Sequence, residues 1–362
     1  MIAIMVYRPD GPGPGRLSEV RLDVGVTGPA EMSCAEVTVR DERGGDLLGG
    51  PDLVFDPAAG GGPLATAQAE RQARAFGIGN AVYWAQQLLR RVNSALRHPL
   101  PPLLLRIGMH GTPSRWGGGH YRLPGVASPA EPNQLSATGE VHLGGGRAYL
   151  PKAKDGGNAY FHAPAHNSAI VLHEVGHHIC RHTADFRVNR RRPAGDQHNG
   201  KIALDEGTSD FLTAFMLGTP DIYRWQRGQL PPTDPRRRLL RAGATMAHLR
   251  PGSGGLAHSN GTIWASALWT AYQRVLDSGA DKDRFLRMVI RGMAGLGATE
   301  APTADEQFRR TQFCELLAET VAVDPALAPT VLAAMAEHGI KPDTSNVELR
   351  EQLRADRARV VH

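Results

Sequence analysis

The chain has 362 residues, a formal net charge of +5, 41% hydrophobic residues and 21% charged residues. This composition excludes an intrinsically disordered chain and allows a large hydrophobic core, arranged as one bilobed unit or two domains. The three cysteines, Cys34, Cys180 and Cys314, form no C-x-x-C pair, which argues against a disulfide framework and a cysteine-based zinc knuckle.

Residues 1–62 predict a β-rich N-terminal region, because short runs alternate apolar and polar positions between glycines and prolines. These runs are IAIMVY, EVRLDVGV, AEVTVRD and DLVFD. The loop Ala58–Pro63 is the expected boundary of this region. Residues 65–97 carry apolar side chains at helical spacing and predict one long helix, with Gly77 and Gly79 marking a place for an interruption.

The next segment, 63–182, is expected to form an N-terminal catalytic lobe. A buried strand (LLLRIGMHG) and two strand-like pieces (HYRL and GEVHL) predict a sheet with long loops. Residues 168–182 predict a helix that has Asn167 or Ser168 as its N-cap.

Residues 183–345 are expected to form a helical C-terminal lobe, followed by a charged tail over 346–362. Helical periodicity predicts five helices in this lobe, at 204–217, 261–277, 281–294, 305–322 and 327–338. The sequence therefore predicts an α+β fold with two lobes and an active site between them.

The candidate metal-binding motif is H-E-V-G-H, from His173 to His177. On a helix, positions i and i+4 share one face, so the two imidazoles can bind one Zn²⁺ from the same side. Glu174 follows the first histidine and can reach a water molecule on the metal, which suits a general base. The motif therefore predicts one catalytic zinc ion.

A catalytic zinc requires a third protein ligand. The metzincin spacing fails, because its third histidine would fall on Thr183. The block Asp205-Glu206-Gly207-Thr208-Ser209-Asp210 offers Glu206 as the ligand, with Asp210 one turn later to hold a ligand imidazole. The alternative is that these acids only complement the dipole of a helix.

H-E-V-G-H-H-I followed by D-E-G-T-S-D-F resembles the gluzincin pattern of thermolysin and fungalysin. A third block, GLAHSNGTIWA around His258, is similar to the stretch where those enzymes carry a histidine that stabilises the transition state. The resemblance spans roughly residues 75–340 and is specific in these three short blocks.

The resemblance implies a thermolysin-like metallopeptidase with His173, His177 and Glu206 as zinc ligands and Glu174 as the base. It also implies that Asp210 orients His173, that Asp205 hydrogen-bonds His177, and that His258 donates to the oxyanion. No tyrosine lies between His177 and Glu206, so a tyrosine partner for the oxyanion is missing from that segment. No calcium site is assigned.

Alternatives stay open for both ligand and function. The G-T-S-D sequence partly matches the aspzincin block, which would make Asp210 the third ligand instead of Glu206. The chain could also be a gluzincin-like fold that acts as a binding protein or on another bond, particularly if loops at 111–166 and 183–200 cover the site. A third hypothesis is a basic nucleic-acid-binding module with incidental histidines.

The expected partner is a peptide or protein substrate. Arginine clusters at 190–192 and 236–238 have no interleaved aromatic residues, which disfavours nucleic acid, and Arg238 is expected mainly at the surface. The sequence shows neither a secretory signal nor an apolar stretch long enough to cross a membrane, so it predicts a cytoplasmic location. It does not define the oligomeric state.

Overall fold

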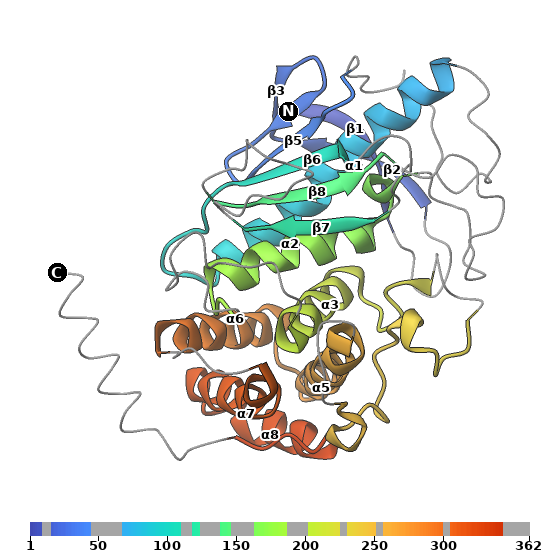
Figure 1. Cartoon of the computed structure of the whole chain (residues 1–362). Helices are drawn as coiled ribbons and strands as arrows, with labels where there is room; N and C mark the ends of the chain where they lie inside the picture. Colours follow the sequence, from blue (N-terminus) through green and yellow to red (C-terminus); the bar gives the residue numbers. More distant parts are fainter. Residues whose placement is uncertain are drawn as a thin grey trace. The chain divides into compact units, whose positions relative to one another are not determined.

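A computed structural model describes residues 1–8, 16–44, 67–109, 118–123, 138–145, 163–186, 202–224, 230–250, 256–299 and 305–342 (Figure 1). The chain divides into two compact units. The first comprises Met1–Arg90, Leu100–His178 and Leu212–Leu239, and the second comprises Arg91–Pro99, Ile179–Phe211 and Leu240–His362. The expected boundary at Ala58–Pro63 and the charged tail over 346–362 lie outside the described residues.

The first unit contains a two-stranded sheet and a six-stranded mixed sheet. Antiparallel β1 and β2 form the smaller sheet, and the larger one has the order β3-β4-β5-β6-β8-β7. The bounds of the strands are β1 Ile2–Arg8, β2 Arg16–Leu22, β3 Gly25–Gly28, β4 Glu31–Ser33, β5 Val37–Asp41, β6 Leu103–Met109, β7 Gly119–Arg122 and β8 Glu140–Gly144. The predicted strands IAIMVY, LLLRIGM, HYRL and GEVHL are confirmed.

The two faces of the six-stranded sheet differ in polarity. β5 pairs with β6 in parallel, as does β6 with β8, whereas β7 pairs with β8 in antiparallel fashion. Side chains alternate between faces along a strand. Val39, Leu105 and Val141 are fully buried on one face. Arg106 and His142 are register partners on the other face.

Helix α1 (Ala67–Asn93) runs without interruption, which confirms the one long helix predicted over 65–97 and excludes the alternative of a break near Gly77 and Gly79. Both glycines serve packing instead. A Cβ on Gly77 would lie 3.3 Å from the Cβ of Ala165, and one on Gly79 would lie 3.5 Å from the Cβ of Ile4. The absence of side chains at these glycines lets neighbouring segments pack closely against the helix. This packing offsets the lower helix stability that glycine causes relative to alanine.

Helix α2 (Ser168–His182) has the predicted bounds. The Asn167 side chain accepts a hydrogen bond from the backbone N–H of Ala169 at 3.0 Å, which identifies Asn167 as the N-cap. The Ser168 hydroxyl donates to the carbonyl of Tyr7 at 3.2 Å and ties the start of the helix to β1. These contacts fix the helix that bears the H-E-V-G-H motif.

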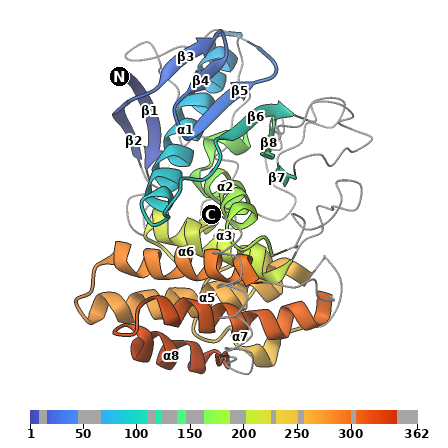
Figure 2. The ribbon, with the colours of Figure 1, turned by 90° about the vertical axis from the view of Figure 1, so that its left-hand side faces the viewer.

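The described residues of the second unit are mainly helical. Its helices are α3 (Ala203–Leu217, whose end belongs to the first unit), α5 (Ala257–Asp277), α6 (Lys282–Thr299), α7 (Asp305–Val323) and α8 (Ala328–Glu337). Helix α6 packs on α7 and α5 packs on α8, and Figure 2 shows these long helices side by side. Helix α5 begins four residues before the predicted start at 261, so His258 lies in its first turn.

The described residues form a mixed α and β structure with a mixed sheet, as the sequence predicts at this coarse level. Within the described part of the chain, no helix combines the length and apolar character needed to cross a membrane.

Candidate metal centre

The two motif histidines are buried side by side on α2, with exposures of 4% for His173 and 6% for His177. Their Nε2 atoms lie 3.2 Å apart. Two nitrogen ligands at the usual Zn–N distance on a tetrahedral ion are about 3.3 Å apart. The pair therefore fits a shared zinc ion, although an N–H donated from one ring to the other would give the same separation.

Glu174 lies beside this pair and is also buried. Its Oε2 is 4.0 Å from the Nε2 of His177. On β7, an ideal Cβ built on Gly119 would lie only 2.7 Å from the Cγ of Glu174. The backbone of β7 therefore packs directly on the carboxylate side chain, and only a glycine allows this approach.

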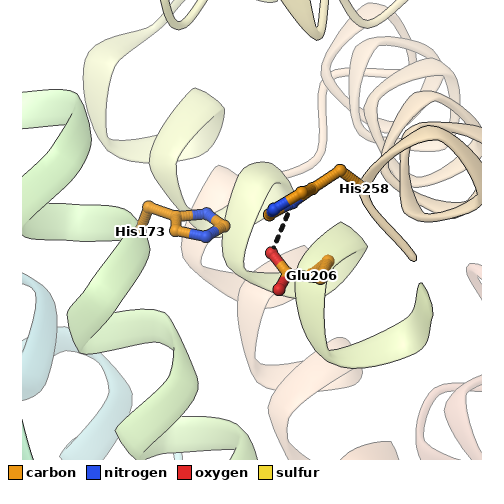
Figure 3. A group of neighbouring side chains, drawn as sticks. All are labelled: His173, Glu206 and His258. Carbon is orange, nitrogen blue, oxygen red and sulfur yellow. Dashed lines mark ion pairs between the residues drawn. The ribbon is translucent and has the colours of Figure 1, made fainter. Parts of the chain in front are cut away.

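The second half of the predicted site comes from α3 and α5. Glu206 is buried, and its Oε2 lies 2.7 Å from the Nδ1 of His258, the ion pair drawn in Figure 3. His258 keeps 30% of its side-chain surface exposed. A buried carboxylate paired with a partly exposed imidazole suits a polar site that solvent or a substrate can reach.

Glycines bring these two helices together. An ideal Cβ on Gly207 would lie 2.3 Å from the carbonyl oxygen of Gly261, and one on Gly261 would lie 2.7 Å from that of Ala203. The backbones of α3 and α5 thus touch one residue after Glu206 and three residues after His258. Close backbone approach explains why both sequence blocks contain a glycine at this point.

A hydrogen bond fixes the same crossing. The indole N–H of Trp264 donates to the Thr208 hydroxyl at 3.1 Å, and both side chains are fully buried. Trp264 also stacks on Phe313, with ring centroids 5.6 Å apart. The tryptophan of the GLAHSNGTIWA block therefore holds α5 in register with α3.

The remaining predicted residues, Asp205 and Asp210, are buried on α3 on either side of Glu206. Their expected roles toward His177 and His173 stay predictions. Both acids are costly to bury without polar or charged neighbours.

The predicted site residues come from both units: His173 and His177 belong to the first unit, and Glu206 and His258 belong to the second. Each unit brings two of these side chains together, with 3.2 Å between the Nε2 atoms of His173 and His177 and 2.7 Å between Glu206 Oε2 and His258 Nδ1.

Sequence reasoning missed the environment of Arg238. The residue was expected at the surface, but it is buried, with an exposure of 7%, and its Nη2 donates to the Nδ1 of His173 at 3.0 Å. The same nitrogen donates to the Tyr223 hydroxyl at 3.2 Å, and the guanidinium lies 4.8 Å from the centre of the Tyr223 ring.

A local backbone feature directs Arg238 inward. Arg238 has a φ of 51°, in the left-handed region, and ends the short 3₁₀ helix Pro235–Arg237. Such a conformation is uncommon for a residue other than glycine and often marks a functional position. Three consecutive arginines in the sequence gave no sign that the third turns away from the other two.

No protein-family model matches the chain. A search of curated proteins likewise finds no matching sequence.

Proposed function

We propose that this protein is a zinc-dependent metallopeptidase of the gluzincin type, with a two-lobed, thermolysin-like architecture. Its zinc ligands are His173, His177 and Glu206. The observation that carries the proposal is the 3.2 Å separation of the two Nε2 atoms on α2, beside the buried carboxylate of Glu174. This combination matches the requirements of hydrolytic zinc sites.

When bound, zinc would lower the pKa of a water molecule and polarise the scissile carbonyl. Glu174 takes the proton of the attacking water and delivers it to the leaving amine. His258 donates a hydrogen bond to the oxygen that becomes negative as the tetrahedral centre forms. Its partial exposure suits this role, because a substrate can reach the ring.

The substrate is proposed to be an extended peptide. β7 ends the order of strands in the described sheet, so its outer backbone groups can pair with another strand. Gly119 at the start of β7 packs on Glu174, which connects this edge to the proposed base. Arg238, next to His173, is suited to hold a carbonyl oxygen of the substrate.

Two observations favour Glu206 over Asp210 as the third ligand. Glu206 pairs at 2.7 Å with His258, the histidine that the proposal places at the same site. Glu206 is also aligned by the Gly207–Gly261 contact, which fixes the start of α3 against α5. Asp210 keeps its proposed role of orienting His173.

The alternative, a gluzincin-like fold without peptidase turnover, depends on loops at 111–166 and 183–200, large parts of which lie outside the described residues. Activity separates the two functions. Purified protein should hydrolyse casein, lose the activity on dialysis against 1,10-phenanthroline, and regain it when zinc is restored. Protein that binds zinc but shows no hydrolysis of casein or of mixed peptides would support the alternative and contradict the peptidase proposal.

A further inference from the structure

A second pair of histidines lies on the polar face of the six-stranded sheet. His120 on β7 and His142 on β8 are register partners in an antiparallel pair, so both side chains project from the same face. The Nε2 of His120 and the Nδ1 of His142 are 3.3 Å apart. This separation is close to that of the two motif histidines on α2.

A carboxylate fixes the orientation of one member of the pair. His142 is fully buried, and its Nε2–H donates to the Oε2 of Glu140 at 2.7 Å. Because the carboxylate accepts, the proton of a neutral His142 ring lies on Nε2 and the lone pair lies on Nδ1. The Nδ1 atom that carries this lone pair is the one that faces His120.

The carboxylate is itself held in place by a charged neighbour. Glu140 is fully buried and accepts a hydrogen bond from Nη1 of Arg106 at 3.2 Å. Arg106 also donates from Nε to Glu42 at 2.7 Å. Burial lowers the pKa of Arg106, but its hydrogen bonds and attraction to Glu42 and Glu140 outweigh burial and raise the pKa above the ordinary value. The guanidinium therefore stays charged beside Glu140.

A histidine that binds a metal commonly donates its other ring N–H to a carboxylate, which fixes the tautomer and makes the ligand nitrogen more basic. The Glu140–His142 contact has this form. Glu140 belongs to β8 itself and lies two residues before His142, so the same strand supplies the ligand and the group that orients it.

We infer that His120 and His142 form a second binding site, for a divalent transition-metal ion, with Glu140 as the residue that positions His142. Imidazole nitrogens favour zinc, copper and nickel over magnesium or calcium. The ligand atoms are His120 Nε2 and His142 Nδ1, and water molecules can complete the coordination. The site is independent of the proposed peptidase function, because it uses neither the residues of α2 nor those of α3 and α5.

Copper is the sharpest probe, because it binds imidazole most tightly of these ions and its electron paramagnetic resonance spectrum reports nitrogen ligands. The measurement is made on the full chain carrying His173→Ala and His177→Ala, which removes the motif pair. We expect one copper ion per chain with hyperfine coupling to two nitrogens. His120→Asn should abolish this signal, and Glu140→Gln should weaken the affinity about 10- to 100-fold.

His98→Asn, at an exposed histidine, is the matched control and should bind copper like the parent. His120 is only partly buried, so His120→Asn keeps the test valid even where a change at the fully buried His142 unfolds the protein. Equal copper affinity and an unchanged spectrum in the parent and His120→Asn would overturn the site. The two nitrogens would then share a hydrogen bond only.

Discussion

Two pairs of histidines in this protein hold their ring nitrogens at nearly equal distances, and they reach that arrangement differently. His173 and His177 lie one turn apart on α2, with 3.2 Å between nitrogens. His120 and His142 lie on neighbouring strands, with 3.3 Å between nitrogens. The first pair follows from local helix geometry and is visible in the sequence. The second pair depends on the register between two strands, which a short sequence motif cannot reveal.

The pairs also differ in the carboxylate beside them. Glu174 lies 4.0 Å from His177, close enough to serve a water molecule at the site without itself holding the ring. Glu140 accepts directly from His142 at 2.7 Å and so fixes the imidazole. The difference teaches that similar histidine pairs can differ through the placement of one acid: we propose a base beside the first pair and a positioning group beside the second.

The largest effect is expected from a substitution of Glu174, the acid beside the first histidine pair. Glu174→Gln keeps the shape of the side chain but removes its ability to take a proton. Peptidase activity should fall about 10²- to 10⁴-fold, the usual contribution of a general base, while zinc content stays the same. Casein hydrolysis and metal analysis by mass spectrometry measure the two quantities. Glu19→Gln, at an exposed acid, is the control, and full activity in Glu174→Gln would remove it from the mechanism.

The next effect is expected at Gly119, which lies beside His120 on β7. Its position faces Glu174, and an added methyl group would push that carboxylate away. Gly119→Ala should lower kcat by about 100-fold, as a displacement on the order of 1 Å does for catalytic groups, with copper binding at His120 retained. Gly25→Ala, where a Cβ would meet only an oxygen at 3.9 Å, is the matched control. Unchanged kcat would mean that β7 does not constrain Glu174.

Gly207 tests the crossing of α3 and α5. A methyl group there would collide with the carbonyl of Gly261, so Gly207→Ala should reduce the free energy of unfolding by about 1–3 kcal/mol. Thermal unfolding followed by circular dichroism measures the loss. Gly243→Ala, at an exposed glycine with nothing within 4 Å of the added Cβ, should leave stability nearly unchanged. Equal melting temperatures for both variants would show that the helices do not depend on this contact.

The smallest effect is expected at the cap of α2. Asn167→Ala removes the acceptor for the Ala169 N–H and should cost about 1 kcal/mol of unfolding free energy. Asn167→Asp keeps an acceptor and should restore most of the stability. Urea denaturation of the three proteins measures both differences. If Asn167→Ala is as stable as the parent, the start of α2 is held by the hydrogen bond from Ser168 to β1 and not by the cap.

The parts predicted best from the sequence are those set by local rules. The bounds of α2 follow from its N-cap and its apolar periodicity, and the strands at 103–109 and 119–122 follow from short runs of β-forming residues. The motif histidines were found because a helix fixes positions four residues apart.

The parts predicted poorly depend on contacts between distant segments. Gly77 and Gly79 look like helix breakers in sequence, yet they admit Ala165 and Ile4 against an unbroken helix. The sequence suggests that Arg238 belongs to a basic surface cluster. Its own left-handed backbone conformation instead directs its side chain toward His173. Neither contact leaves a local pattern, because the partners are separated by many residues in the chain.

The same limit applies to the choice between His177 and His258 as ligands. The helical motif favours His177 as a ligand, whereas His258 lies 2.7 Å from Glu206, the proposed carboxylate ligand. The two alternatives differ in which histidine a metal requires, and variants of single residues separate them.

The central claim is tested most directly by the zinc content of purified protein, measured by mass spectrometry after dialysis in metal-free buffer. All proteins carry His120→Asn so that the second pair adds no metal. We predict about one zinc per chain in this parent, as expected for a catalytic site, loss of that zinc in His177→Ala and Glu206→Ala, and its retention in His258→Ala and Asp210→Ala. Absence of zinc from the parent, even after reconstitution, would contradict the account. Loss in His258→Ala with retention in His177→Ala would replace the ligand set.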